Sequence, residues 1–347
     1  MTGLRVAVIG AGLALRSCLA PDLFELFLAT CGRPGRRFTL LSERLRVLHE
    51  VAGDPDRDPF APQSLSTSVN RQTLREILAA GLGPRIRFGC ELTRFDPGDG
   101  GVRLDFSGGH HAETDLLVGA DGLNSAVRRQ YLPDARVLDT GSRCIYGKTP
   151  LTDAALRLLP PSLPDGFTAI AGGRVGMAAG LVQFRQRPEQ AAAVIAPGVR
   201  LSPAGDYLMW AISADHQRFP VPDLHLAGLG PGGLHGIAAT MIRSWHPDLR
   251  GLVGLADIGQ TFLVRIRTSV PVPAWEPGPG DAAGRRYPRH EPGPWLRGEH
   301  RLAGRRRAVP GAGQGGAGAP AADRCDRRLR KPDARLRIRR RPGVPGG

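Results

Sequence analysis

Apolar residues in the first third of the chain recur at the spacings of strands and helices. Residues 4–9 (LRVAVI) form a compact apolar run that ends at Gly10, as is typical of a buried parallel strand entering a glycine turn. From Ser68 to Leu82 the apolar positions follow helical spacing behind Asn70, a good N-cap, and predict a helix. Three strand-like runs separated by turn-rich segments then predict a meander that returns to the main sheet. These runs are residues 85–95, 102–106 and 116–118.

The pattern changes after Arg136, where short strand-like runs alternate with proline-rich connections. We expect a second, sheet-based domain in this part of the chain. A helix is expected at residues 232–245, followed by a strand at 261–270 that runs into VPVPAWEPG. The shorter strand-like runs are residues 169–170, 175–184 and 207–212.

The net charge of +15 is concentrated at one end of the chain. Residues 281–347 contain 18 Lys+Arg and 6 Asp+Glu, a net +12 that leaves only +3 for residues 1–280. This tail is rich in Arg, Gly, Pro and Ala and has little hydrophobic periodicity, so it is expected to be largely disordered. An arginine-rich nucleic-acid binder remains an alternative, although the tail has few aromatic residues for base stacking.

Cysteine spacing and hydropathy indicate the compartment. The five cysteines are widely spaced and form no C-x-x-C pair, which favours neither a zinc cluster nor a disulfide framework. We find no apolar run long enough for a membrane span and no export signal. A soluble, cytoplasmic protein without metal, membrane or nucleic-acid partners is expected.

Two glycine turns carry the candidate chemistry. Gly10, Ala11 and Gly12 follow the first strand as the start of a G-x-G-x-x-G fingerprint, although Leu15 replaces the third glycine. The helix that should follow is cut short by Pro21, and Glu43 is the only candidate for the ribose-binding acid. A glycine turn after any buried strand is the alternative interpretation.

The second turn lies in DLLVGADGLNSAVRR, residues 115–129. A strand leads to Gly119, Ala120, Asp121 and Gly122, and a helix containing Ser125 and Arg128 follows. This G-A-D-G-x-x-S-x-V-R pattern resembles the internal signature of the FAD-dependent monooxygenases of the aromatic-hydroxylase type. In that family the acidic turn lies close to the FAD pyrophosphate and the pyridine-nucleotide path.

The resemblance gives the other motifs an interpretation. It implies that Gly10, Ala11 and Gly12 form the first FAD motif and that Arg71 matches an arginine near the flavin. Four later stretches also resemble the middle region of the family: CIYGKTPL, DYLMWAIS, MIRSWHPDLRGLV and TSVPVPAW. Within them, Trp210 and His246 are expected to be structural.

The family chemistry follows from the same resemblance. NAD(P)H acts as a transient reductant of FAD, and O₂ is then used to hydroxylate a small organic substrate. No universal side-chain nucleophile is required, so no catalytic residue is assigned. Another FAD-dependent oxidoreductase and an inactive, pseudogene-like product remain alternatives.

The sequence departs from the family pattern at two places. The second FAD motif, VTLLGDAxHAMSP, is replaced by GDAAGRRYPRH. If residues 280–286 were encoded GGT GAC GCT GCT GGG CGA CGC, the neighbouring frame would read VTLLGDA, which indicates a frameshifted tail. Because Lys148 and Lys331 are the only lysines among 47 basic residues, GC-rich coding DNA is indicated. Near residue 13 the family pattern implies an internal loss of several tens of residues, including the ribose-binding glutamate. Glu43 is then not expected to bind the ribose.

Together these observations predict an α/β fold. An incomplete Rossmann-like FAD-binding domain, truncated internally, is expected at residues 1–135, and a sheet-based substrate domain at 136–275. The aberrant, disordered tail spans residues 281–347.

Overall fold

A computed structural model describes residues 18–33, 35–53, 68–98, 101–114 and 117–270, all within one unit of the chain, residues 1–299. The predicted strand at residues 4–9 lies outside the described residues. The tail beyond residue 280 and its frameshift interpretation also lie outside them.

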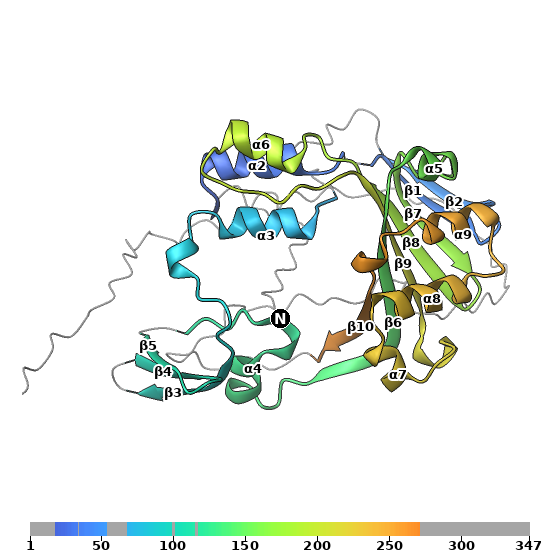
Figure 1. The fold of residues 1–347 in the computed structure, drawn as a ribbon. Coiled ribbons are helices and arrows are strands. Elements are labelled where there is room, and N and C mark those ends of the chain that lie inside the picture. Colours follow the sequence, from blue (N-terminus) through green and yellow to red (C-terminus); the bar gives the residue numbers. More distant parts are fainter. Residues whose placement is uncertain (1–17, 34, 54–67, 99–100, 115–116, 271–347) are drawn as a thin grey trace, which may run out of the picture. The chain divides into compact units, whose positions relative to one another are not determined.

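A mixed seven-stranded sheet forms the centre of the described structure (Figure 1). Strands β1 and β7 are parallel, whereas every other neighbouring pair is antiparallel. The strands in spatial order are β10 (Phe262–Ser269), β6 (Val137–Pro150), β9 (Tyr207–Asp215), β8 (Val175–Val182), β7 (Gly166–Gly172), β1 (Arg37–Ser42) and β2 (Val47–Ala52).

Helices cover one face of this sheet and build the main core with it. Alternate residues of the strands point to the same face, so Ile145, Met177 and Trp210 join a single buried cluster. In Figure 1 helices α8 and α9 lie against the strands of the sheet, and their apolar residues belong to the same cluster. The helices that contribute are α5 (Asp153–Arg157), α7 (Asp223–Gly228), α8 (Pro231–Met241) and α9 (Pro247–Gly254).

Three further helices form a smaller core. Leu26, Ile77 and Ala191 are essentially inaccessible to solvent and belong to one cluster. The Glu76 carboxylate accepts hydrogen bonds from the backbone N–H and the hydroxyl of Ser202, which ties one of these helices to a distant loop. The helices are α2 (Pro21–Thr30), α3 (Arg71–Ala79) and α6 (Pro188–Ile195).

Helix α3 confirms the helix predicted behind Asn70. The Asn70 Oδ1 accepts hydrogen bonds from the backbone N–H of Gln72 at 3.0 Å and of Thr73 at 3.1 Å, so two otherwise unpaired donors are satisfied. The predicted helix at 232–245 corresponds to α8, and the strand predicted at 261–270 corresponds to β10.

The Asn70→Ala variant should lose this cap. We expect its free energy of unfolding to fall by about 1 kcal/mol, because a buried N-terminal turn would keep unpaired N–H groups. Urea unfolding measures the change, and Asn70→Ser, which retains a capping oxygen, should recover most of it. Equal stability of the alanine and serine variants would contradict the capping role.

The predicted meander is an antiparallel sheet of its own. Its strands are separate from the seven-stranded sheet. The expected return to the main sheet depends on residues 4–9 and 115–116, which lie outside the described residues. Of the strand expected at 116–118, residue 116 lies outside the described residues, and the prediction is wrong for residues 117 and 118, which belong to no strand. The third strand of the meander lies earlier in the chain. The strands are β3 (Leu92–Gly98), β4 (Gly101–Phe106) and β5 (His111–Thr114).

The strand predicted at 85–95 begins later than expected. A short 3₁₀ helix, η1 (Gly83–Arg85), precedes it, and Gly89 adopts a φ of 74°, which interrupts an extended backbone. The longest strand of the protein's described part, β6, was not predicted as a strand. The seven-stranded sheet also contains β1 and β2, which precede residue 135. The sheet therefore includes strands from both sides of the expected domain boundary.

Within the described ranges, no helix combines the length and the apolar character that a membrane crossing requires.

Candidate functional site

One face of the seven-stranded sheet has a floor of small side chains. Along β8 and β9 every second residue is buried in the main core, as Ala179 and Trp210 are, whereas the residues between them are partly exposed. We call this surface the open face. Its floor consists of Gly176, Ala178, Gly180, Ala211 and Ser213.

Two aromatic pairs frame the floor. Phe38 and Phe167 stack on β1 and β7 with ring centroids 6.3 Å apart. Tyr146 and Phe262 stack on β6 and β10 with centroids 4.8 Å apart. Since β8 and β9 lie between these strand pairs, the small residues form a strip between two aromatic borders.

The start of helix α3 reaches the open face beside Tyr146. The Asn70 Nδ2 donates to the Tyr207 hydroxyl at 3.5 Å, and Arg71, the first residue of α3, is exposed next to these tyrosines. Burial raises the pKa of Tyr146, the neighbouring Tyr207 raises it further, and the charge of Arg71 opposes the rise. The structure therefore places the flavin-adjacent arginine of the resemblance at this face.

A lysine lies on the same face. Lys148 follows Tyr146 by two residues on β6, so both side chains point the same way. The Lys148 Nζ lies 4.9 Å from the centroid of the Tyr207 ring and 3.4 Å from the Gln260 Oε1. Sequence reasoning assigned no role to Lys148. The rarity of lysine in the chain is the one sequence feature that could have drawn attention to it.

The acidic turn at Asp121 has a defined local structure. The Asp121 Oδ2 accepts a hydrogen bond from the Ala126 N–H at 2.7 Å. A Cβ on Gly119 would lie 2.9 Å from the Val127 side chain, so this approach requires glycine. Gly122 has a φ of 73°, which glycine adopts without strain.

The predicted helix after this turn is present. Ser125 caps helix α4 (Ala126–Tyr131) by accepting a hydrogen bond from the Arg128 N–H at 2.8 Å, and the 3₁₀ turn η2 (Gly122–Asn124) precedes it. The strand-turn-helix expectation is thus confirmed from the turn onward.

Strand β10 connects the acidic turn with the open face. At its start Phe262 stacks on Tyr146, and near its end the Arg267 Nη1 donates to the Asn124 Oδ1 at 3.0 Å. Five residues of extended strand separate these contacts by roughly 16 Å. One strand therefore links the two groups of residues that the resemblance assigns to the cofactor.

The acidic turn contains groups that suit an anionic ligand. Arg128 is 8 % exposed, and its Nε and Nη1 atoms are buried without a hydrogen-bond partner among the described residues. These two atoms are covered by protein, so they are not open to a ligand in this structure. The glycine turn that leads into the start of α4 nevertheless fits the phosphate portion of a dinucleotide such as FAD.

The other sequence candidates have different placements. Gly10, Ala11 and Gly12 lie outside the described residues. Glu43 lies in the turn after β1, where its N–H donates to the Ala171 carbonyl and its carbonyl accepts from the His246 N–H.

The two residues expected to be structural have structural contacts. Trp210 is completely buried and donates from Nε1 to the Thr149 Oγ1 at 3.1 Å. The His246 ring accepts a hydrogen bond from the Asp248 N–H at the start of α9.

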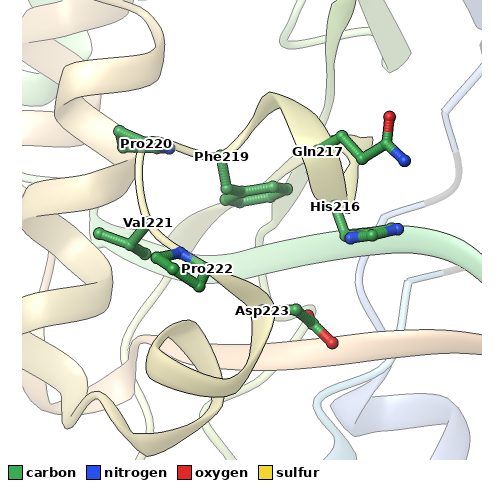
Figure 2. A pocket seen from close by; sticks show the side chains of 7 residues that line it. All are labelled: His216, Gln217, Phe219, Pro220, Val221, Pro222 and Asp223. Carbon is green, nitrogen blue, oxygen red and sulfur yellow. The ribbon is translucent and has the colours of Figure 1, made fainter.

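A separate pocket of about 330 Å³ lies between β9 and α7, beside the short helix η3 (His216–Arg218). Figure 2 shows His216 and Gln217 on one side and three consecutive residues, 220–222, on the other. The one acidic residue that lines this pocket, Asp223, accepts hydrogen bonds from Arg143, so its negative charge is already balanced within the protein. None of the predicted cofactor residues lines this pocket.

Comparison with known proteins relates the chain to FAD-dependent monooxygenases. No protein-family model matches the chain. The dual O-methyltransferase/FAD-dependent monooxygenase elcB of Phaeosphaeria nodorum is 27% identical over an alignment of 307 residues, and the match covers 76% of this chain and 31% of that protein. The chain therefore spans less than a third of this curated relative.

Solved structures show the same fold. A protein of Photorhabdus luminescens assigned as an FAD-containing monooxygenase matches with a TM-score of 0.63 and 23% identity, over 79% of this chain and 67% of that one. HpxO of Klebsiella pneumoniae, solved with FAD and uric acid, matches with a TM-score of 0.54 and 21% identity, over 76% and 59% of the two chains.

The fold of the described residues is thus that of the FAD-containing monooxygenases. The chain is a relative of proteins named FAD-dependent monooxygenases, as the resemblance of its acidic turn predicted.

Proposed function

We propose that this protein is an FAD-dependent monooxygenase that hydroxylates a small organic substrate with NAD(P)H and O₂. The observation that carries the proposal is the position of Arg71 beside Tyr146, at the border of the small-residue floor. An accessible surface of small residues between aromatic borders can accept a flat ring system, and a nearby arginine can interact with its polar groups. The names of the relatives support the same chemistry.

The proposed cofactor residues come from three parts of the chain. Gly10, Ala11 and Gly12 form the first contact with FAD, Arg71 lies near the flavin, and the turn of Gly119, Asp121 and Gly122 approaches the pyrophosphate. FAD would supply electron transfer from NAD(P)H and the activation of O₂. The chain's own residues would orient the substrate on the floor and keep water from it.

The domain plan belongs to the same proposal. Residues 1–135 would carry an incomplete Rossmann-like FAD-binding domain, residues 136–275 the substrate domain, and residues 281–347 an aberrant tail. The sharing of β1 and β2 with the large sheet means that the first domain also contributes to the substrate surface. Widely spaced cysteines favour a reducing, cytoplasmic compartment, and we propose no nucleic-acid or membrane partner.

The visible absorption spectrum of the purified full chain, with and without added FAD, tests the proposal. Oxidised flavin that stays with the protein through gel filtration is the expected result, followed by NAD(P)H oxidation and incorporation of oxygen into a substrate. Protein that elutes from gel filtration without flavin after incubation with excess FAD would overturn the proposal. Bound flavin with NAD(P)H oxidation but without oxygen incorporation into any product would indicate another FAD-dependent oxidoreductase.

The Arg71→Met variant tests the residue on which the proposal depends. We expect its Kd for FAD to rise about tenfold, because an interaction between a positive group and the flavin would be lost. Arg75→Met, one turn later on the exposed side of α3, is the matched control and should bind FAD as the unmodified protein does. Equal weakening in both variants would remove the specific role of Arg71.

A further inference from the structure

Lys148 places a positive charge on the open face. It lies on β6, two residues after Tyr146 and opposite Met209 of β9, so its stem borders the small-residue floor. It is the only lysine among the described residues, since Lys331 lies in the tail. Every other position on the floor is apolar or small, apart from the hydroxyl of Ser213.

The hydrogen-bonding capacity of Lys148 is not used up within the described structure. An ammonium group has three N–H donors. Within the described ranges, its only hydrogen-bond acceptor is the Gln260 Oε1 at 3.4 Å, a long contact, and the Tyr207 ring provides a cation–π partner at 4.9 Å. Among the residues described here, no carboxylate lies within ion-pair distance of its Nζ.

The surroundings make an anionic partner favourable. Burial lowers the pKa of Lys148, and the negative charge of Asp257 opposes this effect. Asp257 forms no ion pair with Lys148 among the described residues, and its Oδ1 accepts a hydrogen bond from the Gly259 N–H. A half-buried ammonium with spare donors gains more from an anion than a fully hydrated one does.

The shape of the open face favours a flat ring system in the ligand. A strip floored by Ala178, Gly180 and Ala211 and bordered by stacked aromatic pairs can accept a flat ring system. We propose that Lys148 is a specificity-determining residue that binds the carboxylate or phenolate of an aromatic substrate lying on this floor. The inference rests on the proposed monooxygenase function and names the charge class of its substrate.

Titration calorimetry with two matched probes tests this role. The probes are 2-naphthoate, an aromatic anion, and 2-naphthamide, its neutral counterpart of similar shape. The full chain without added FAD should bind 2-naphthoate about tenfold more tightly than 2-naphthamide, because only the anion forms a charge-assisted hydrogen bond with the ammonium group. Lys148→Met should abolish this preference, and Lys148→Arg should retain most of it.

Lys331→Met is the matched control, since it removes the other lysine and should leave the preference unchanged. Thermal melting of each variant shows whether the fold is retained. A tenfold preference that survives in Lys148→Met would overturn the proposal, and so would equal or absent binding of the two probes by the unmodified chain. The titration involves no flavin, so its outcome is independent of the FAD spectrum that tests the monooxygenase function.

Discussion

Replacing Trp210 by alanine is expected to lower the free energy of unfolding by about 3 to 5 kcal/mol, the largest effect of any single substitution considered for this protein. The Trp210 side chain is completely buried at the centre of the main cluster, and its Nε1 donates to the Thr149 hydroxyl. Alanine would leave a cavity, because the rigid sheet cannot collapse onto the site. The Thr149 hydroxyl would lose the hydrogen bond that it accepts but would still donate to the Leu252 carbonyl at 2.7 Å.

Thermal and urea unfolding measure this loss, which should lower Tm by roughly 6 to 20 °C for a domain of this size. Val194→Ala is the control, since Val194 is an apolar residue on α6 that is 81% exposed. It should change the free energy of unfolding by no more than about 0.5 kcal/mol. Similar melting of the two variants would show that Trp210 is not at the centre of a packed core.

The Arg143→Met variant is expected to produce the second large effect, a loss of about 2 to 3 kcal/mol near neutral pH. The Arg143 side chain is 4% exposed and donates to both Asp139 and Asp223. Removing the guanidinium would leave Asp139 and Asp223 without their shared partner, and Asp223 would keep, among the described residues, only the longer ion pair with Arg265 at 3.8 Å. The estimate lies below the usual cost of breaking a buried pair because both carboxylates are partly exposed.

The pH dependence identifies the origin of this loss. Hydrogen bonds from Arg143 lower the pKa of Asp139 and of Asp223. A carboxyl group with a lowered pKa in the folded state stabilises the protein above its unfolded pKa of about 4, and this contribution disappears as the pH falls through the folded value. The stability difference between the unmodified chain and Arg143→Met should therefore narrow below about pH 4. Urea unfolding at pH 7 and pH 3 measures it.

Arg94→Met provides the matched control for this experiment, because Arg94 forms an equally short ion pair with Asp96 at the surface. Its removal should leave stability unchanged, since solvent screens exposed pairs. A constant difference between Arg143→Met and the unmodified chain from pH 7 to pH 3 would contradict the role of the two aspartates.

Local patterns were sufficient to predict much of the secondary structure. The N-cap at Asn70 and the apolar spacing behind it predicted α3, and the alternation after Thr261 predicted β10. The alternation of apolar and polar residues did not predict β6, because both faces of this strand pack against other groups and its polar residues include Arg143 and Lys148. Pairing between distant segments, such as β1 with β7, leaves no signal in either segment alone.

The candidate site was only partly visible in the sequence. The turn around Asp121 could be found because its glycines and its capping serine lie close together in the chain. The proximity of Arg71 to Tyr146 could not be found in the same way, because these residues belong to separate elements 75 positions apart and tertiary packing alone brings their elements together. Lys148 was overlooked for the same reason.

The parallel pairing of β1 with β7 also sets an order of events during synthesis. Phe38 pairs with Phe167, 129 positions later in the chain. At about 5 to 20 residues per second, the hairpin of β1 and β2 emerges roughly 6 to 26 s before its partner strand is made. During that interval both edges of the hairpin are unpaired, and Val47, Leu48 and Val51 remain at least half exposed even in the finished sheet. The nascent chain is therefore most vulnerable to association with other chains before β7 leaves the ribosome.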